Sequence, residues 1–125
     1  MKEVISTPDA PAAVGPYSQA IKVNGLLFCS GQIALDPATG SLKGEDVASQ
    51  TEQVMQNIAA VLAAAGASFD DVVKTTCYLT DINDFARFNA VYGSFFTGKP
   101  ARSCVAVAAL PKGALVEVEV IAEIK

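Results

Sequence analysis

The chain is 125 residues long, which predicts one domain over residues 1–125 with roughly two-thirds of its unfolded surface buried. Apolar residues make up 51% of the chain and charged residues only 18%, so it is rich in core-forming side chains. The net charge is -4 and the nine Lys and Arg residues are scattered, which argues against a nucleic-acid partner because no basic cluster could follow a phosphate backbone.

The first third of the chain reads as irregular structure followed by a hairpin. Prolines and glycine interrupt residues 7–17 and exclude a helix there. Asn24-Gly25 is a two-residue hairpin turn, so strands are expected over residues 20–23 and 26–30. Residues 36–40 contain proline and glycine among polar residues and predict a turn.

The remainder alternates between helical and strand patterns. Apolar residues at helical spacing predict a helix from about Val47 to Ala65 and a second one from about Asp84 to Phe96. A β-branched run predicts a strand over residues 72–80, and the last two strands are expected over 103–109 and 114–124. This order predicts an α+β fold in which a sheet carries both helices on one face.

Strand alternation predicts which side chains share a face of the sheet. In the last strand, alternate valines occupy one face and Glu117 lies on the other. If Val105 and Val107 also pack on the helices, then Arg102, Cys104 and Glu117 lie together on the helix-free face. That face would also carry several apolar residues, so we expect a second copy of the chain to cover it. These residues are Ala106, Ala108, Leu115 and Ile121.

Three residues near the end of the chain are the main candidates for chemistry. Arg102 could hold a carboxylate through two parallel hydrogen bonds, or it could form a structural ion pair. Glu117 could orient and deprotonate a water, or it could belong to a solvated strand face. Cys104 could act as a nucleophile only if its pKa were lowered, and a small buried residue is the equal alternative. We favour that second interpretation for Cys29 and Cys77.

Other candidates come from the irregular segments and the second helix. Tyr17 follows a Gly-Pro pair, where a side chain can project into a pocket or simply pack. Ser30 and Gly31 end a strand, and the glycine would let a ligand approach backbone N–H groups, although a Ser-Gly pair is a weak signal. Asn89 and Tyr92 lie on the second helix, where Tyr92 belongs to the apolar stripe and is expected in the core.

The cysteines and the absent histidine indicate a compartment and limit the chemistry. Three widely spaced cysteines without a CxxC pair are typical of reduced thiols in a cytoplasmic protein. The first residues lack the layout of a signal peptide, and no apolar run approaches the ~20 residues of a membrane span. Histidine is absent, which removes both the usual proton carrier at neutral pH and the common zinc ligand sets.

Four segments of the chain form a recognisable set of motifs. They are Ala-Pro-Ala-Ala-Val-Gly-Pro-Tyr-Ser-Gln (10–19), Ser-Gly-Gln-Ile (30–33), Asp-Phe-Ala-Arg-Phe-Asn (84–89) and Pro-Ala-Arg-Ser-Cys-Val (100–105). Together they resemble the RidA (YjgF) family of reactive-intermediate deaminases. The resemblance runs along essentially the whole chain in the same order, and the presence of Arg102 matches the RidA subfamily. It implies a chorismate-mutase-like α+β unit, assembled as a homotrimer with the sheets facing inward and a site at each subunit interface.

The resemblance also implies an activity, the hydrolysis of 2-iminobutanoate and 2-iminopropanoate to 2-keto acids and ammonia without metal or cofactor. Arg102 would hold the substrate carboxylate, and Glu117 would position the attacking water and move its proton. Cys104 would contact the imine through its backbone or thiol. The remaining residues would line the pocket, namely Tyr17, Ser30, Gly31 and Asn89.

The chain differs from the family pattern at two places, and two alternative functions remain open. The segment Phe96–Lys99 is shorter than in many relatives, and Ala106 and Ala109 stand where many members carry Glu and Arg. Some members are called endoribonucleases or translation inhibitors, but the acidic pI of about 4.6 and the missing histidine argue against that function. A carboxylate-binding sensor or holdase chaperone without turnover is the other alternative.

Overall fold

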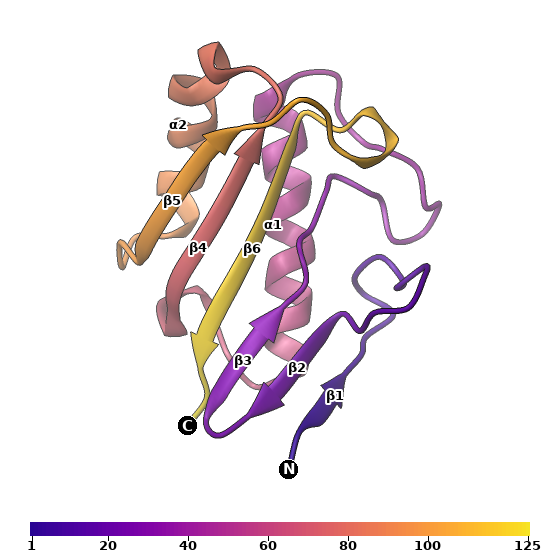
Figure 1. The fold of residues 1–125 in the computed structure, drawn as a ribbon, viewed down its shortest axis with the longest axis vertical. Helices are drawn as coiled ribbons and strands as arrows, with labels where there is room; N and C mark the ends of the chain where they lie inside the picture. The colour runs from indigo at the N-terminus through magenta and orange to yellow at the C-terminus, as the bar shows by residue number, and fades with distance from the viewer.

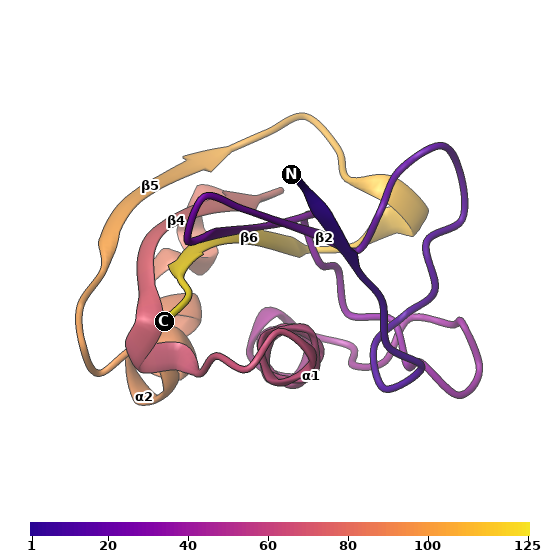
Figure 2. The ribbon, with the colours of Figure 1, turned by 90° about the horizontal axis from the view of Figure 1, so that it is seen from below.

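Six strands form one mixed sheet, and both α-helices lie on the same face of it (Figures 1 and 2). The computed structural model describes all of residues 1–125. The strands are β1 (Glu3–Ile5), β2 (Ala20–Val23), β3 (Leu26–Cys29), β4 (Val72–Leu79), β5 (Ala101–Ala106) and β6 (Val116–Glu123). The helices are α1 (Val47–Ala64) and α2 (Phe85–Phe95), with short 3-10 turns at Phe69–Asp71, Ile82–Asp84 and Pro111–Gly113. The predicted α+β class is confirmed.

The sheet order is β1-β2-β3-β6-β4-β5, and β4 and β5 form its only parallel pair. The predicted hairpin joins β2 to β3, where Asn24 and Gly25 both take positive φ values of 51° and 77°. The strand β1 was not expected from the sequence, because its three residues lie beside a proline-rich segment. It extends the sheet by pairing antiparallel with β2.

Both helices begin and end close to the expected residues. At the start of α1, the Asp46 carboxylate accepts a hydrogen bond from the Ser49 backbone N–H at 2.8 Å, which caps the helix. Gly66, with φ of 78°, follows its last turn. In α2 the buried aromatic side chains are those of Phe88 and Tyr92. No helix combines the length and apolar character needed to span a membrane.

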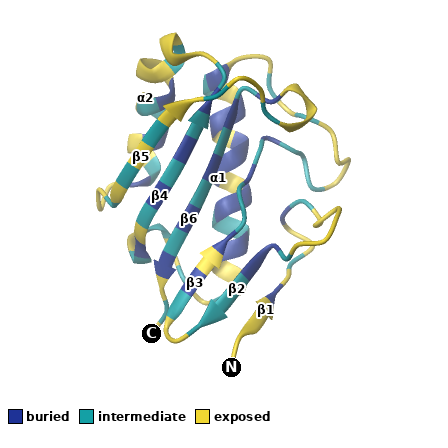
Figure 3. Ribbon diagram, in the orientation of Figure 1, coloured by how far each residue is buried: buried dark blue, intermediate teal, exposed yellow.

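The core lies between the helices and the alternate residues of the central strands (Figure 3). Val116, Val118 and Val120 of β6 are at most 2% exposed, and Glu117 and Glu119 point to the opposite face. The prediction for β6 is therefore confirmed.

The prediction for β5 is wrong. Arg102 is paired in register with Thr75, and Cys104 with Cys77, and both β4 residues are buried beneath the helices. Since residues opposite each other in adjacent strands share a face, Arg102 and Cys104 point to the helix side of the sheet. Val105 pairs with Tyr78 on the other face and remains 45% exposed.

The helix-free face of the sheet carries an apolar row that crosses four strands. Val4 pairs with Ile21, Ile21 with Phe28, and Phe28 with Ile121. Val4 is 57% exposed and Phe28 is 42% exposed. We call this row, together with Val105, the open apolar face. Large apolar side chains that stay exposed on one face of a sheet are a feature of interaction surfaces.

A buried amide attaches the segment after β3 to helix α1. Asn57 is 1% exposed, and its Nδ2 donates to the carbonyl oxygens of Ile33 at 3.2 Å and Leu35 at 2.9 Å. Its Oδ1 accepts from Gln53 Nε2 at 2.9 Å. Most of the segment after β3 is not paired with a strand, so the hydrogen bonds of the Asn57 side chain fix its path.

We expect Asn57→Ala to lower the free energy of unfolding by roughly 2–3 kcal/mol, because it leaves buried polar groups without partners. Gln56→Ala, on the exposed side of the same helix, is the matched control and should change stability by less than about 0.5 kcal/mol. Urea unfolding of both variants measures the difference. Equal stability of the two variants would contradict the role assigned to Asn57.

Candidate functional site

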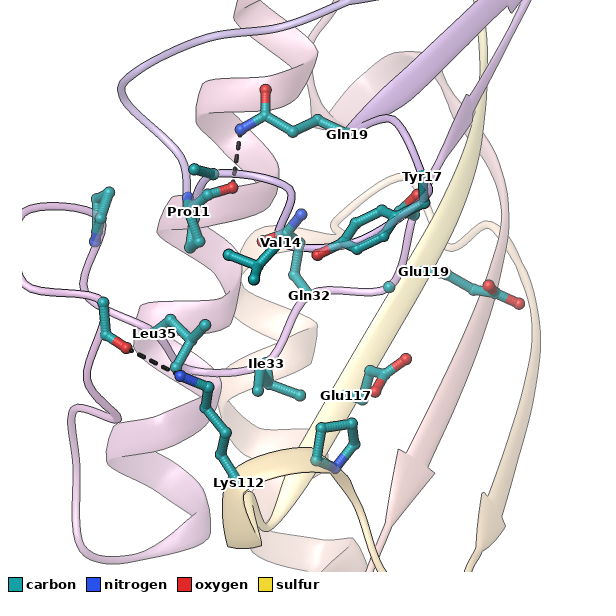
Figure 4. Close-up of a pocket in the computed structure, with 16 residues that line it drawn as sticks. Pro11, Val14, Tyr17, Gln19, Gln32, Ile33, Leu35, Lys112, Glu117 and Glu119 are labelled. Atoms are coloured by element: carbon teal, nitrogen blue, oxygen red, sulfur yellow. Dashed lines mark hydrogen bonds between the residues drawn. The ribbon is translucent and has the colours of Figure 1, made fainter.

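A cavity of about 730 Å³ lies between the N-terminal loop, the segment after β3 and the start of β6 (Figure 4). It brings together four of the residues singled out from the sequence. These are Tyr17, Ser30, Gly31 and Glu117. Glu119 and Lys112 also line it, and Lys112 Nζ donates to the Gly40 carbonyl at 3.4 Å across its rim.

The buried side chain of Gln19 helps to hold the N-terminal loop in place. Its Oε1 accepts from the Thr7 backbone N–H at 2.7 Å, and its Nε2 donates to the carbonyls of Thr7 at 3.1 Å and Pro11 at 2.8 Å. The loop carries Tyr17, which is 54% exposed at the cavity. Sequence reasoning missed Gln19, because a glutamine beside a strand gives no signal of burial.

Ser30 and Gly31 have different structural roles at the cavity. The Ser30 hydroxyl donates to the Ser18 carbonyl at 2.6 Å, so it fixes the loop. Gly31 lies directly against the Glu117 side chain. A Cβ atom at position 31 would clash with the Glu117 carboxylate and lie 2.9 Å from its Cδ. A glycine is therefore required for Glu117 to keep its present position.

Glu117 is half-buried, and burial raises the pKa of its carboxyl above the ordinary value, with the nearby charge of Glu119 acting in the same direction. Glu119 in turn accepts a hydrogen bond from the Tyr78 hydroxyl at 3.4 Å. A carboxyl group with a raised pKa is suited to hold and release a proton under mild conditions.

Arg102 is half-buried at the other side of the sheet, against helix α2. Its Nη1 donates to Asn89 Oδ1 at 2.7 Å. Its Cζ lies 4.8 Å from the ring centroid of Tyr92 and 5.4 Å from that of Phe85. The only ion pair in the chain joins two other residues, so the alternative of a structural ion pair within the chain does not hold for Arg102. It borders a second cavity of about 450 Å³ at the end of α2.

The three cysteines are free. Burial raises the pKa of both Cys29 and Cys77 to about 12, which agrees with their interpretation as small core residues. Burial also raises the pKa of Cys104, although the Arg102 charge acts in the opposite direction. Cys104 therefore remains a thiol at neutral pH, which does not suit a nucleophile. No three acidic, cysteine or histidine side chains gather closely enough to hold a metal ion.

The expected site residues thus fall into two groups within the chain. Arg102, Cys104 and Asn89 lie on the helix side of the sheet, at β5 and α2. Glu117 lies on the other face, in the cavity that Tyr17 also lines. The expectation that Arg102, Cys104 and Glu117 share one face is corrected by the register of β4 and β5. The two groups are called the arginine half-site and the glutamate half-site below.

The chain is thus a small α+β protein in which a half-buried arginine and a half-buried glutamate lie on opposite faces of one sheet. The family model described as Endoribonuclease L-PSP matches residues 7–124. The putative regulator AldR of Lactococcus lactis is 57% identical over 124 residues, which cover 98% of both chains. A 2-iminobutanoate/2-iminopropanoate deaminase of Mus musculus is 48% identical over 123 residues, which cover 98% of this chain and 91% of the mouse protein. The chain therefore belongs to the RidA (YjgF) family.

Solved structures agree with this membership. RidA from an Antarctic Psychrobacter bacterium is similar with a TM-score of 0.94 and 49% sequence identity, covering 98% of this chain and 99% of that chain. TdcF from E. coli, solved with bound serine, has a TM-score of 0.93 and 42% identity, covering 98% of this chain and 99% of that chain.

We expect Gly31→Ala to push the Glu117 carboxylate out of its present position, because the new methyl group occupies the same space. The fold should survive with a loss of about 1 kcal/mol, since the end of a glutamate side chain can swing away. Gly93→Ala is the control, because a Cβ there meets nothing within 4 Å. A crystal structure of Gly31→Ala with Glu117 unmoved would refute the steric argument.

Proposed function

We propose that this protein is a hydrolytic deaminase of small 2-imino acids, which releases a 2-keto acid and ammonia. The observation that carries the proposal is Arg102, a half-buried arginine oriented by Asn89 and two aromatic rings without an acidic partner in its own chain. A guanidinium in this state is prepared to take a carboxylate through two parallel hydrogen bonds. The mouse relative, whose name is that of an imine deaminase, supports the same choice.

The complete site is proposed to form between copies of the chain in a homotrimer whose sheets face inward. Two features support this assembly. The open apolar face exposes the apolar row from Val4 to Ile121, and a second copy of the chain could bury this row. The glutamate and arginine half-sites also lie on opposite faces of one sheet, so they can meet at one substrate only when they come from different protomers.

In the proposed reaction, Arg102 holds the substrate carboxylate and fixes the imine carbon near Glu117. Glu117 accepts a proton from a water as the water oxygen bonds to that carbon, and it passes this proton to the imine nitrogen, which gives a carbinolamine with one hydroxyl and one amino group. Glu117 then takes the hydroxyl proton and transfers it to the amino nitrogen, so the C–N bond breaks and ammonia leaves as the C=O bond forms. An activated C=N bond hydrolyses readily, so positioning and one proton carrier suffice.

The other residues support these two groups. Asn89 orients Arg102, and Gly31 leaves room for Glu117. Tyr17 and the Ser30–Gly31 backbone border the glutamate half-site, whereas Cys104, as a neutral thiol, shapes the arginine half-site. TdcF, solved with bound serine, supports a small ligand that carries a carboxylate beside a nitrogen. Three free cysteines fit a reducing compartment such as the cytoplasm.

We expect Arg102→Ala to lower kcat/KM for 2-iminobutanoate on the order of a hundredfold, because the carboxylate loses a charged hydrogen-bonded partner. The substrate is generated in situ by a threonine dehydratase, and keto-acid release is measured. Arg87→Ala is the matched control, since Arg87 is an exposed arginine on α2 that pairs only with Asp84. The control should turn over at the wild-type rate.

The same preparations separate the alternative functions. Wild-type turnover in Arg102→Ala would reject the carboxylate clamp. Saturable 2-ketobutyrate binding by the wild-type protein without faster imine decay would indicate a sensor instead of an enzyme. RNA cleavage that survives removal of contaminating nucleases and falls in Arg102→Ala would indicate the endoribonuclease activity in the description of the family model.

The pH dependence of the rate should report on Glu117. As a base, Glu117 must be ionised, so activity falls as pH drops through its raised pKa. Glu119→Gln removes the neighbouring like charge and lowers the pKa of Glu117, so the acid limb of the pH–rate profile should move to lower pH. Glu123→Gln, an exposed carboxylate of the same strand, should leave the limb in place. A limb that stays or moves upward in Glu119→Gln would contradict this coupling.

A further inference from the structure

We propose that Tyr92 is the positioning residue of Arg102, and that its ring, fixed by Thr75, holds the guanidinium in the orientation that receives a carboxylate. This inference rests on the proposed function, because it assigns the clamp of the imino acid to a pair of residues instead of to one. Tyr92 was expected from the sequence to be only a core residue of α2. The contacts of its hydroxyl group and of its ring indicate a second role.

The hydroxyl end of Tyr92 is fixed to the central sheet. Its oxygen shares a hydrogen bond of 2.7 Å with Thr75 Oγ1, and Thr75 is 1% exposed. Thr75 is also the register partner of Arg102 in the parallel pair of β4 and β5. Tyr92 therefore connects helix α2 to the residue that lies directly beside Arg102 on the neighbouring strand.

The ring of Tyr92 packs against one ring from α2 and one ring from the residue that follows the helix. The ring centroid of Phe88 lies 5.4 Å away and that of Phe96 lies 4.5 Å away. Tyr92 itself is 8% exposed. A ring with this packing and a hydroxyl hydrogen bond has little freedom to rotate, so it provides a rigid surface for a cation.

Arg102 meets that surface at 4.8 Å from its Cζ to the ring centroid, within the range of a cation–π contact. Its other neighbours are less constrained. Phe85 is 36% exposed and lies farther away at 5.4 Å, and Asn89 is only half-buried. Phe85, Asn89 and Tyr92 are spaced by four and three residues, so they form one stripe of α2 that faces Arg102.

Burial raises the pKa of the Tyr92 hydroxyl above its ordinary value, so the ring stays neutral near pH 7. It therefore orients the guanidinium without neutralising it, which an acidic side chain at the same place would do. Because Asn89 takes a single Nη1 hydrogen, the other N–H groups of Arg102 stay available for a carboxylate.

The first test uses the free protein and does not depend on turnover. The chain has two arginines, Arg87 and Arg102, so ¹⁵N relaxation of the arginine Nε–H groups gives two signals, assigned with Arg87→Lys. In Tyr92→Leu the relaxation of the Arg102 Nε–H group should show a more mobile side chain, while that of the exposed Arg87 stays unchanged. In Tyr92→Phe, which keeps the ring but loses the hydrogen bond to Thr75, the order of Arg102 should lie between that of Tyr92→Leu and that of wild type. An Arg102 signal that is equally ordered in Tyr92→Leu and wild type overturns the inference.

The second test measures 2-ketobutyrate binding by calorimetry. Tyr92→Leu should weaken binding on the order of tenfold, whereas Tyr92→Phe should stay within about threefold of wild type. Leu27→Ala is the matched control, because Leu27 is 0% exposed in β3, which β6 and β4 separate from the strand of Arg102. It should lower the melting temperature but leave the dissociation constant within about twofold. Equal weakening in Leu27→Ala and Tyr92→Leu would show a merely structural role and reject the proposal.

The two proposals fail in different ways. If Arg102→Ala binds 2-ketobutyrate as tightly as wild type, the carboxylate clamp itself is wrong. If Arg102→Ala loses binding and Tyr92→Leu does not, the clamp stands and the role of Tyr92 is wrong.

Discussion

The parallel pairing of β4 with β5 decides where the only half-buried arginine of the chain points. It sets Arg102 beside Thr75 and Cys104 beside Cys77, and the antiparallel pairing of β4 with β6 continues these rows to Val120 and Val118. Every residue in these rows therefore faces the helices. A shift of one residue would turn Arg102 to the open face and expose its cation on the same side as Glu117. The register thus separates the two charges across a sheet.

This separation has an electrostatic consequence. Within one protomer Arg102 and Glu117 cannot neutralise each other, since the sheet lies between them. Arg102 keeps its donors for a ligand, and the pKa of Glu117 is raised by burial and Glu119 without an opposing cation. A site completed between protomers, as proposed, brings the two groups to one substrate while each is held by its own chain.

Local patterns in the sequence predicted the elements, because each pattern carries its own physical cause. Asn24-Gly25 favours the hairpin through positive φ values, and apolar residues at helical spacing predicted α1. The direction of Arg102 could not be predicted in this way, because the valines of an edge strand look the same whether they face a core or an interface. Val105 shows the difficulty: it is β-branched and apolar, yet it is 45% exposed on the open face. The burial of Gln19 was not predicted for the opposite reason, since the sequence gives no sign that a polar residue is buried.

The two half-sites are stabilised by different kinds of contact, and this follows from the backbone that carries them. The glutamate half-site is bordered by irregular segments without a full set of strand hydrogen bonds, so buried amides, Gln19 and Asn57, supply partners to their backbone groups. The arginine half-site lies on β5, which is paired along one edge with β4, and on helix α2, whose backbone groups are hydrogen-bonded within the helix. Its side chains are therefore free to pack as aromatic rings, and a rigid ring orients a cation without taking its charge. The glutamate half-site is therefore stabilised by hydrogen bonds from buried amides, and the arginine half-site by the packing of aromatic rings.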